Sequence, residues 1–232
     1  MIEGDFGKIG VIIPAFNEEQ SIAKVIADIP SYVDEIVVAN NASTDRTAEV
    51  AEKAGATVLL ELSRGYGNAC LKGISYFKAK SEQPDIIVFL DGDYSDYPEQ
   101  MTEVLQPILD SHADMVIGSR ALGRRAKSSM TIPQVFGNWL ATNMIKVFYK
   151  VSFTDLGPFR AIKFDKLMAL KMEDKTYGWT VEMQVKAAKM KFNSVEVPVD
   201  YKARIGVSKV SGTVKGAVLA GYKIIWTIFK YL

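Results

Sequence analysis

The 232-residue chain contains one cysteine, Cys70, and one histidine, His112. A single thiol cannot form an internal disulfide, and a single histidine cannot supply a metal site built from several histidines. Any metal site must therefore rely on carboxylates. Cys70 lies between alanine and leucine, which favours a buried structural thiol. His112 lies beside acidic residues and is expected at the surface.

Neither charge is in large excess, since 28 Lys and Arg face 27 Asp and Glu. This balance argues against nucleic acid as a partner, because such binding usually needs a strong basic excess. The first eight residues lack the apolar core of a secretory signal, so we expect a cytoplasmic protein. Apolar residues make up 48% of the chain, enough for one α/β domain over residues 1–213.

Apolar β-branched runs alternate with amphipathic stretches. Strands are predicted at residues 9–14, 35–39, 57–60, 86–90, 115–118 and 195–199, and helices at 18–29, 44–54, 68–80, 134–151 and 180–191. Continuous apolar strands separated by helices indicate a parallel sheet covered on both faces. Such sheets bind ligands at the carboxyl ends of their strands. Polar segments follow the first five strands, which predicts a single functional rim.

Asp91, Gly92 and Asp93 follow the predicted strand 86–90 directly. Two carboxylates two residues apart can face one cation, and Gly92 permits a tight turn between them. Oxygen ligands suit Mg²⁺ or Mn²⁺, which usually take one or two carboxylates together with substrate phosphates. A solvated Asp-Gly turn is the alternative, because short motifs often occur by chance.

Two further segments of the rim could bind a nucleotide. Residues 40–45, from Asn40 to Asp45, offer side-chain acceptors for a uracil or guanine edge, or they could only cap a helix. Residues 64–68 place Arg64 and Gly67 at a helix start, where backbone amides favour phosphate. A structural turn is the alternative for this second segment, which lacks the spacing of known phosphate-binding glycine motifs.

The sequence as a whole resembles the family 2 glycosyltransferases of GT-A fold, nearest the branch of dolichyl- and polyprenyl-phosphate mannose and glucose synthases. The matching segments are VIIPAFNEEQSI, VVANNASTDRT, SRGYGNACLKGI, IIVFLDGDYSDYP, MVIGSR, FGN, DLGPFRAI, YGWTVEM and EVPVDYKARIGVSKVSGT. They run in the family's order over nearly the whole chain. The resemblance implies a mixed, mainly parallel sheet and inverting transfer of a hexose from a nucleoside diphosphate sugar, such as UDP-glucose or GDP-mannose.

The resemblance also implies roles for residues near the donor. Pro14, Phe16 and Glu18 match a loop that packs on the nucleotide base and ribose. Asp45 matches an acid beside the nucleotide. Asp91 and Asp93, discussed above, match the family's DXD pair, with Asp93 as the direct metal ligand.

A second set of matches lies nearer the acceptor. Arg120 matches an arginine near the phosphates, and Asp155 matches an acid on the acceptor side. Arg204, Ser208 and Lys209 match a late basic loop that closes over the diphosphate and acceptor. An anionic lipid phosphate would need no general base, whereas a hydroxyl acceptor would make Asp155 the candidate base.

The sequence departs from the mannose synthase pattern at two places. Ser95 stands where a glutamine of the acidic motif can help to bind metal, and no arginine precedes Asn138 in MTIPQVFGN. These changes leave the donor nucleotide and the acceptor open. The acceptor could be a polyprenyl or dolichyl phosphate or a small soluble hydroxyl compound, and a sugar-nucleotide-binding module without transfer activity is a further alternative.

The C-terminal segment, residues 214–232, is apolar but carries Lys223, Lys230 and several aromatic residues. Its apolar part, at about 17 residues, reaches only the lower limit for spanning a bilayer. Lysine, tryptophan and tyrosine fit a helix lying at the cytoplasmic face of a membrane. Docking on the sheet or on a second subunit, as in a homodimer, is the alternative.

Overall fold

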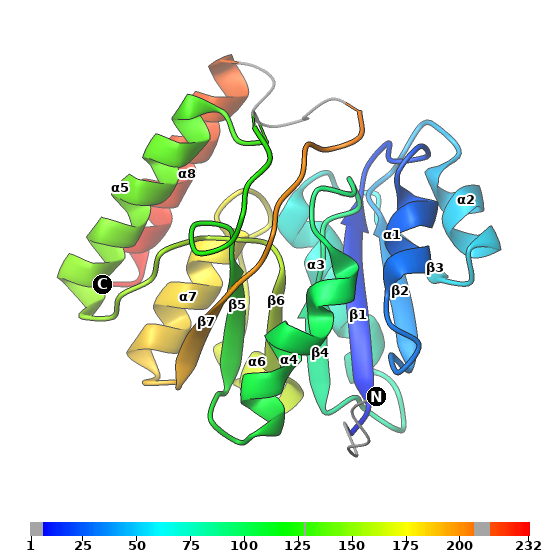
Figure 1. Ribbon diagram of the computed structural model, residues 1–232, viewed down its shortest axis with the longest axis horizontal. Helices are drawn as coiled ribbons and strands as arrows, with labels where there is room; N and C mark the ends of the chain where they lie inside the picture. The colour runs from blue at the N-terminus through cyan, green and yellow to red at the C-terminus, as the bar shows by residue number, and fades with distance from the viewer. Residues whose placement is uncertain (1–6, 128, 207–213) are drawn as a thin grey trace.

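The computed structural model describes residues 7–127, 129–206 and 214–232. Seven strands of this part of the chain form one sheet in the order β3-β2-β1-β4-β6-β5-β7 (Figure 1). They are β1 (Ile9–Ala15), β2 (Glu35–Asn40), β3 (Thr57–Leu60), β4 (Ile86–Phe89), β5 (Met115–Ser119), β6 (Arg160–Lys163) and β7 (Ser194–Pro198). Only β6 is antiparallel to its neighbours, β4 and β5. The expected α/β fold with a mixed, mainly parallel sheet is confirmed.

Helices cover both faces of this sheet. They are α1 (Ile22–Asp28), α2 (Thr47–Lys53), α3 (Tyr66–Lys78), α4 (Met101–Leu109) after the 3₁₀ turn η1 (Pro98–Gln100), α5 (Ile132–Tyr149), α6 (Phe164–Leu170), α7 (Trp179–Lys189) and α8 (Val214–Lys230). Side chains from α1, α2 and α4 join one apolar cluster, and those from α3, α5, α6, α7 and α8 join the other. The strands separate these two cores.

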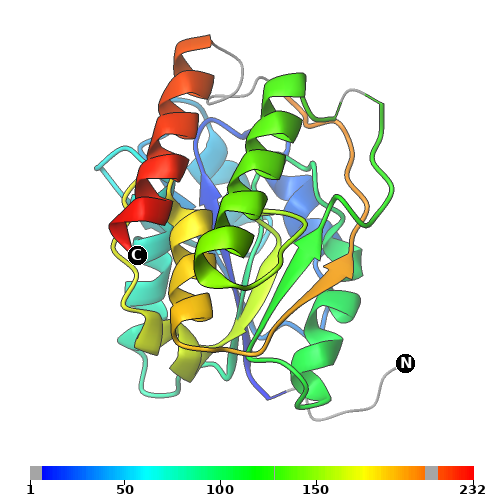
Figure 2. The same cartoon turned by 90° about the vertical axis from the view of Figure 1, so that its left-hand side faces the viewer.

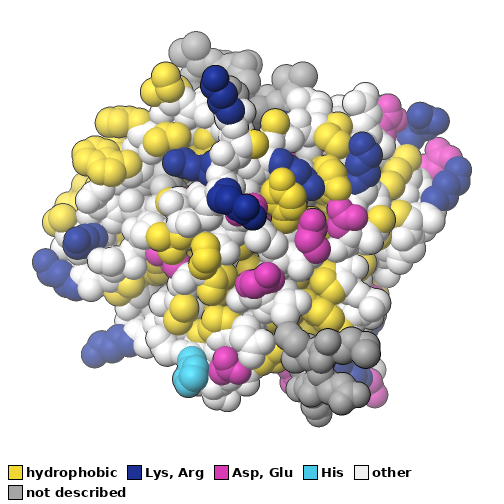
Figure 3. Space-filling view, in the orientation of Figure 1, with side chains coloured by type: hydrophobic (Ala, Val, Ile, Leu, Met, Phe, Trp, Pro, Cys, Tyr) yellow, Lys and Arg dark blue, Asp and Glu magenta, His cyan; other side chains and the backbone are white. Residues whose placement is uncertain are grey.

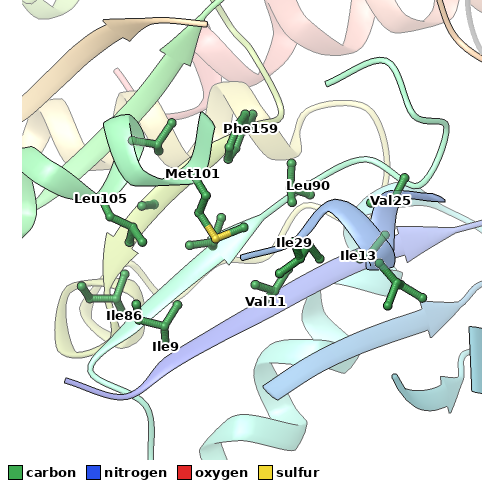
Figure 4. Packing of buried hydrophobic residues seen from close by; sticks show 14 of the residues in the cluster. Ile9, Val11, Ile13, Val25, Ile29, Ile86, Leu90, Met101, Leu105 and Phe159 are labelled. Carbon is green, nitrogen blue, oxygen red and sulfur yellow. The ribbon is translucent and has the colours of Figure 1, made fainter. Parts of the chain in front are cut away.

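Side chains along the central strands point alternately to the two faces of the sheet and so contribute to both cores. Val11 and Ile13 of β1 point into the cluster under α1 and α4 (Figure 4). Ile12 between them belongs to the other cluster, under α3. Strand side chains alternate between the two faces, so a strand buried on both sides reads as a continuous apolar run. Cys70 of α3 is fully buried in the second cluster, as its apolar neighbours indicated.

Helix boundaries differ from the expected ones mainly at the amino ends. The helix expected over residues 18–29 begins at Ile22, and the one expected from residue 44 begins at Thr47. Neither Ser43 nor Thr44 caps the second of these helices. The Asp45 carboxylate accepts the Thr47 amide at 3.0 Å, whereas the Ser43 hydroxyl accepts the amide of Asn17.

The pairing of the strands places the polar segments that follow them at one edge of the sheet, as predicted. Ala15 at the end of β1 pairs with Asn40 at the end of β2, and Asn40 pairs with Leu60 at the end of β3. Strand β6 enters the sheet at the same edge, because Arg160 at its start is opposite Phe89 at the end of β4. The segment before β6, which carries Asp155, is therefore delivered to the rim.

The C-terminal helix α8 packs on the body of the protein through one of its faces. Ile228 is fully buried, its carbonyl accepts the Tyr149 hydroxyl of α5, and Lys223 pairs with Asp174 at 3.0 Å. Within the described part of the chain, no helix has the length and apolarity required to cross a bilayer. The division into a domain of residues 1–213 and a separate C-terminal helix stays a prediction.

Candidate active site

The acidic turn after β4 holds two carboxylates in different environments. Asp93 is 2% exposed, and its Oδ1 accepts the amide and hydroxyl of Ser95 at 2.9 and 2.5 Å. Its Oδ2 forms an ion pair with the guanidinium of Arg204. The Oδ1 of Asp91 is buried without a hydrogen-bond partner among the described residues, and burial raises the pKa of Asp91. The turn thus holds one carboxylate paired with a cation and one whose Oδ1 has no hydrogen-bond partner among the described residues.

A third acid, Asp96, lies beside this pair. It is 2% exposed, and neither of its carboxyl oxygens has a hydrogen-bond partner within the described residues. Burial, with the charge of Asp91 as the next cause, raises the pKa of Asp96 to about 7. Asp96 was not among the predicted site residues, although its place as the third acid of DGDYSD was a visible signal.

Residues 200–206 lie as a strap along the acidic turn. The amide of Lys202 donates to the Ser95 carbonyl and the amide of Ile205 to the Asp93 carbonyl, each at 2.9 Å. The Lys202 ammonium lies 3.3 Å from the ring centre of Tyr94. These contacts hold the strap against the turn and place Arg204 on Asp93. Ser208 and Lys209, predicted to act in the same loop, lie outside the described residues.

Arg120 and Asp155 form a buried pair at the ends of β5 and β6. The Arg120 guanidinium donates to both oxygens of Asp155 at 2.8 and 2.7 Å, and the Arg120 amide adds a third bond at 2.8 Å. The amides of Thr154 and Asp155 donate to the carboxylate of Glu196 on β7. Asp155 is 1% exposed, so its carboxylate orients Arg120 and is closed to an incoming acceptor. This geometry disfavours Asp155 as a general base, because a base must reach the proton it removes.

The predicted nucleotide residues lie along the ends of β1, β2 and β3, where Pro14 is the penultimate residue of β1. The Arg64 guanidinium stacks over the ring of Phe16, with 3.8 Å between its central carbon and the ring centre. The Glu18 carboxylate accepts the Ser21 hydroxyl at 3.0 Å. Asp45 accepts the amides of Thr47 and Glu19, so it joins two loops as well as capping α2.

Asn40 and Asn41 contribute differently to this end of the rim. Asn40 accepts the amide of Ser43 at 3.1 Å, which stabilises its own turn. Asn41, which belongs to the same predicted segment, donates to the carbonyls of Glu61 and Ser63 and accepts the amide of Gly65. Its side chain therefore fixes the course of the segment that carries Arg64.

Gly67 serves close packing in this structure. A Cβ built on it would lie 2.0 Å from the carbonyl oxygen of Asp174, and one on Gly65 would lie 2.1 Å from that of Lys175. The amide of Asn68 donates to the same Lys175 carbonyl at 3.1 Å. Only glycine lets the start of α3 approach this loop so closely.

A cavity of about 460 Å³ opens beside these charged groups. Asp91, Arg120 and Arg204 line its charged end, together with the tyrosines Tyr66 and Tyr201. Its other walls come mainly from the start of α5, the start of α7 and one face of α8, and include Pro133, Gly137, Leu156, Pro158, Trp179, Ala220, Gly221 and Ile224. Figure 3 shows Lys and Arg side chains gathered in the upper half of the face drawn there, near the ends of the parallel strands. The cavity is thus charged at one end and largely apolar along the rest.

The family follows from comparison with known proteins, because the model of glycosyl transferase family 2 matches residues 10–170. The chain belongs to glycosyl transferase family 2. It is 33% identical to an uncharacterized glycosyltransferase of Mycobacterium tuberculosis, over 91% of this chain and 94% of that protein. It is 28% identical to an undecaprenyl-phosphate mannosyltransferase of Micrococcus luteus, over 90% of each chain. It is 29% identical to a dolichyl-phosphate hexose transferase of Haloferax volcanii, over 94% of this chain and 93% of that protein.

Solved structures agree on the fold. The glucosyl-3-phosphoglycerate synthase of Mycobacterium tuberculosis, in complex with Mn²⁺, UDP-glucose and phosphoglyceric acid, superposes with a TM-score of 0.76. The match covers 97% of this chain and 79% of that one at 20% identity. The protein is therefore a glycosyltransferase with the expected GT-A fold.

Proposed function

We propose that this glycosyltransferase moves a hexose from a nucleoside diphosphate sugar to the phosphate of a polyprenyl lipid. In this reaction an acceptor phosphate oxygen bonds to the anomeric carbon as the bond from that carbon to the diphosphate breaks. Attack from the opposite side inverts the anomeric centre. The observation that carries the proposal is the cavity of about 460 Å³, whose charged end suits phosphates and whose apolar walls suit a prenyl chain.

The acidic turn fits a divalent cation, Mg²⁺ or Mn²⁺, at Asp91 and Asp93. The orphaned, buried Oδ1 of Asp91 is the supporting observation, because a buried acceptor without a partner is costly unless a ligand satisfies it. The described residues bring no three acidic, histidine or cysteine side chains close enough to hold a metal alone. Two carboxylates leave coordination positions for diphosphate oxygens, as Mg²⁺ sites usually require. A bound cation would neutralise charge that develops on the departing diphosphate.

Arg204 must leave Asp93 before Asp93 can bind a cation. The freed guanidinium would then lie beside the diphosphate, where a preorganised positive charge stabilises the leaving group. Arg120 would contact phosphate from the other side of the cavity, held in place by Asp155. Ser208 and Lys209 would extend the same basic strap over the diphosphate and acceptor.

The donor nucleotide would occupy the ends of β1, β2 and β3. Phe16 and Arg64 already form a flat, stacked pair there, and such a pair can receive a base on its open side. Pro14, Glu18, Asn40 and Asp45 would shape this subsite. Gly67 lies in α3 and serves close packing, and Gly92 has no positive φ that would require glycine in the acidic turn. The uracil of UDP-glucose or the guanine of GDP-mannose would stack on this pair, since every nucleobase presents a flat face.

A small phosphate-bearing acceptor is the second candidate. The structurally similar glucosyl-3-phosphoglycerate synthase was crystallised with phosphoglyceric acid, and such a compound would fill only the charged end of the cavity. A lipid phosphate makes use of both ends. A lipid phosphate needs no general base, because its oxygen is already anionic, whereas transfer to a hydroxyl of a small acceptor would need one.

Release of nucleoside diphosphate tests the proposal. Purified protein is given UDP-glucose or GDP-mannose with Mn²⁺, with and without polyprenyl phosphate in detergent. We expect release from one donor that needs both lipid phosphate and metal, and that falls sharply in Asp93→Asn. Polyprenol, which lacks the phosphate, is the matched control. Release that is unchanged by chelator or by Asp93→Asn would refute the metal site. Equal release with polyprenol and with polyprenyl phosphate would refute the phosphate as acceptor.

A further inference from the structure

Helices α5 and α8 present apolar side chains to solvent along their outer faces. On α5, Ile132 and Trp139 are 86% and 58% exposed, and on α8, Tyr222 and Trp226 are 67% and 51% exposed. The exposed apolar residues of the two helices are Ile132, Val135, Phe136, Trp139, Val147, Phe148, Val218, Leu219, Tyr222, Trp226 and Phe229. Many follow helical spacing, such as 132-136-139 and 218-222-226-229, so each helix has an outer apolar stripe.

The two stripes join into one surface. Helices α5 and α8 lie side by side in both ribbon views and face the reader in Figure 2. The rings of Phe148 and Phe229 touch across the junction with 5.3 Å between their centres. In Figure 3, hydrophobic side chains gather at the edge of the molecule where these helices lie. Surfaces of this kind usually mark an interaction site.

The charged side chains of the two helices are all positive. Neither α5 nor α8 contains an aspartate or glutamate. Lys223 and Lys230 pair with acids of the protein body, but Lys146 and Lys150 at the end of α5 have no ion pair with any described residue. The same holds for Arg125 and Lys127 just before α5, so unpaired cations lie beyond both ends of its apolar stripe.

This pattern selects an anionic lipid surface over a second copy of the chain. Two copies meeting through this face would bring lysines together with no acid from either helix, and like charges repel at an interface. A helix with an apolar outer face, basic ends and tryptophan at its side can lie in the headgroup layer. An 18-residue helix such as α5 is about 27 Å long, so its two cationic ends could contact headgroups at once.

The cavity of about 460 Å³, which is the proposed acceptor cavity, is lined in part by the same two helices. Gln134 and Gly137 of α5 and Ala220 and Gly221 of α8 line it. A Cβ on Gly137 or Gly221 would meet no atom within 4 Å, so both glycines border open space. A lipid leaving a membrane in contact with this face would have a short path to the charged end of the cavity.

We propose that the joint outer face of α5 and α8 docks on an anionic membrane and holds the mouth of the acceptor cavity at the headgroup layer. The role of this docking rests on the proposed lipid acceptor, whereas the docking surface itself is inferred from the exposed apolar side chains and the positive charges of the two helices. Docking would concentrate the enzyme where a membrane-bound phosphate lies.

Vesicle flotation tests this surface. Full-length protein is floated with phosphatidylcholine vesicles, with or without phosphatidylglycerol. We expect binding to the anionic vesicles, weakened by salt, and at least a tenfold loss of affinity in the double variant Trp139→Ser, Trp226→Ser. Leu62→Ser is the matched control, because Leu62 is 74% exposed but follows β3 at the far edge of the sheet. Donor binding by calorimetry should be equal in all three proteins, showing that they are folded.

Tryptophan fluorescence locates the contact independently. The chain has three tryptophans, of which Trp179 is buried and Trp139 and Trp226 are exposed. We expect brominated anionic lipid to quench the wild-type signal, and Trp139→Phe with Trp226→Phe to abolish quenching while vesicles are still bound. Persistent quenching in that variant would place the contact elsewhere.

Three outcomes would overturn the inference. The first is the absence of binding to anionic vesicles, and the second is equal binding by the serine double variant and the wild type. The third is a dimer in sedimentation velocity that dissociates in the serine double variant, with no vesicle binding by either protein. If the protein transfers sugar to polyprenyl phosphate in detergent but does not bind vesicles, the docking surface is refuted and the proposed function is not. If the protein binds vesicles but transfers no sugar to the lipid, the proposed function is refuted and the docking surface is not.

Discussion

Replacing Arg204 by glutamine should have opposite effects on metal binding and on sugar transfer. In the structure Arg204 pairs with Asp93, whose side chain is 2% exposed, while that of Arg204 is 31% exposed. A hydrogen bond between charged groups contributes about 1.5–3 kcal/mol. Since about 1.4 kcal/mol changes an equilibrium constant tenfold, a cation that no longer displaces Arg204 should bind roughly 10- to 150-fold more tightly. Solvent screening of the partly exposed arginine favours the lower end of that range.

Binding of Mn²⁺ alone, followed by loss of the free-ion electron paramagnetic resonance signal, measures this effect without nucleotide. Arg204→Gln should lower the Kd for Mn²⁺ by about tenfold and yet slow transfer, because the diphosphate loses a cation. Arg124→Gln is the matched control, since Arg124 pairs with Asp200 in the same region but its side chain is 92% exposed. Unchanged or weaker Mn²⁺ binding in Arg204→Gln would refute the idea that Arg204 occupies the cation position.

Three further predictions concern the cavity, the third acid and the nucleotide loop. Gly221→Leu should raise the KM for polyprenyl phosphate at least tenfold without changing donor affinity, because the new side chain would enter open space lining the cavity; an unchanged KM would remove the prenyl chain from this cleft. Burial raises the pKa of Asp96 from its ordinary 3.8 to about 7, so the folded protein holds an extra proton between these values. Its free energy of unfolding should therefore fall as pH rises from about 4 to 7, and denaturant titrations of Asp96→Asn should show a smaller fall; identical pH profiles would contradict this. Asp45→Ala should lower stability by about 1 kcal/mol through loss of the cap on α2, and calorimetry should show weaker nucleotide diphosphate binding if Asp45 also faces the donor.

Local patterns in the sequence were sufficient to predict most of the framework. Strands β1, β4 and β5 were visible because they are nearly continuous apolar runs, whereas β7 alternates valine with polar residues and proline. Strand β6 was harder to define. It has four residues, begins with the fully buried Arg160 and ends with a lysine, so its composition does not suggest a central strand. Arg160 is tolerated there because its guanidinium donates to the carbonyls of Gly157 and Thr180.

The site was predicted less completely than the framework, because its contacts join distant segments. Nothing near Asp155 in the sequence shows that Arg120, 35 residues earlier, occupies both of its oxygens. Likewise, the pairing of Arg204 with Asp93 depends on a strap that follows the last strand. Residue types and motifs therefore predicted which groups gather at the rim, whereas their pairing required the tertiary structure.

The most direct test of the central claim is a competition between acceptors for one labelled donor. The protein is incubated with the radiolabelled nucleotide sugar that it binds, Mn²⁺, and equal amounts of polyprenyl phosphate and 3-phosphoglycerate in detergent. Label is then counted in the organic and aqueous phases, with Gly221→Leu run beside wild type. We expect acid-labile label in the organic phase, reduced in Gly221→Leu. Label confined to aqueous phosphoglycerate product, at the same level in both proteins, would contradict this claim.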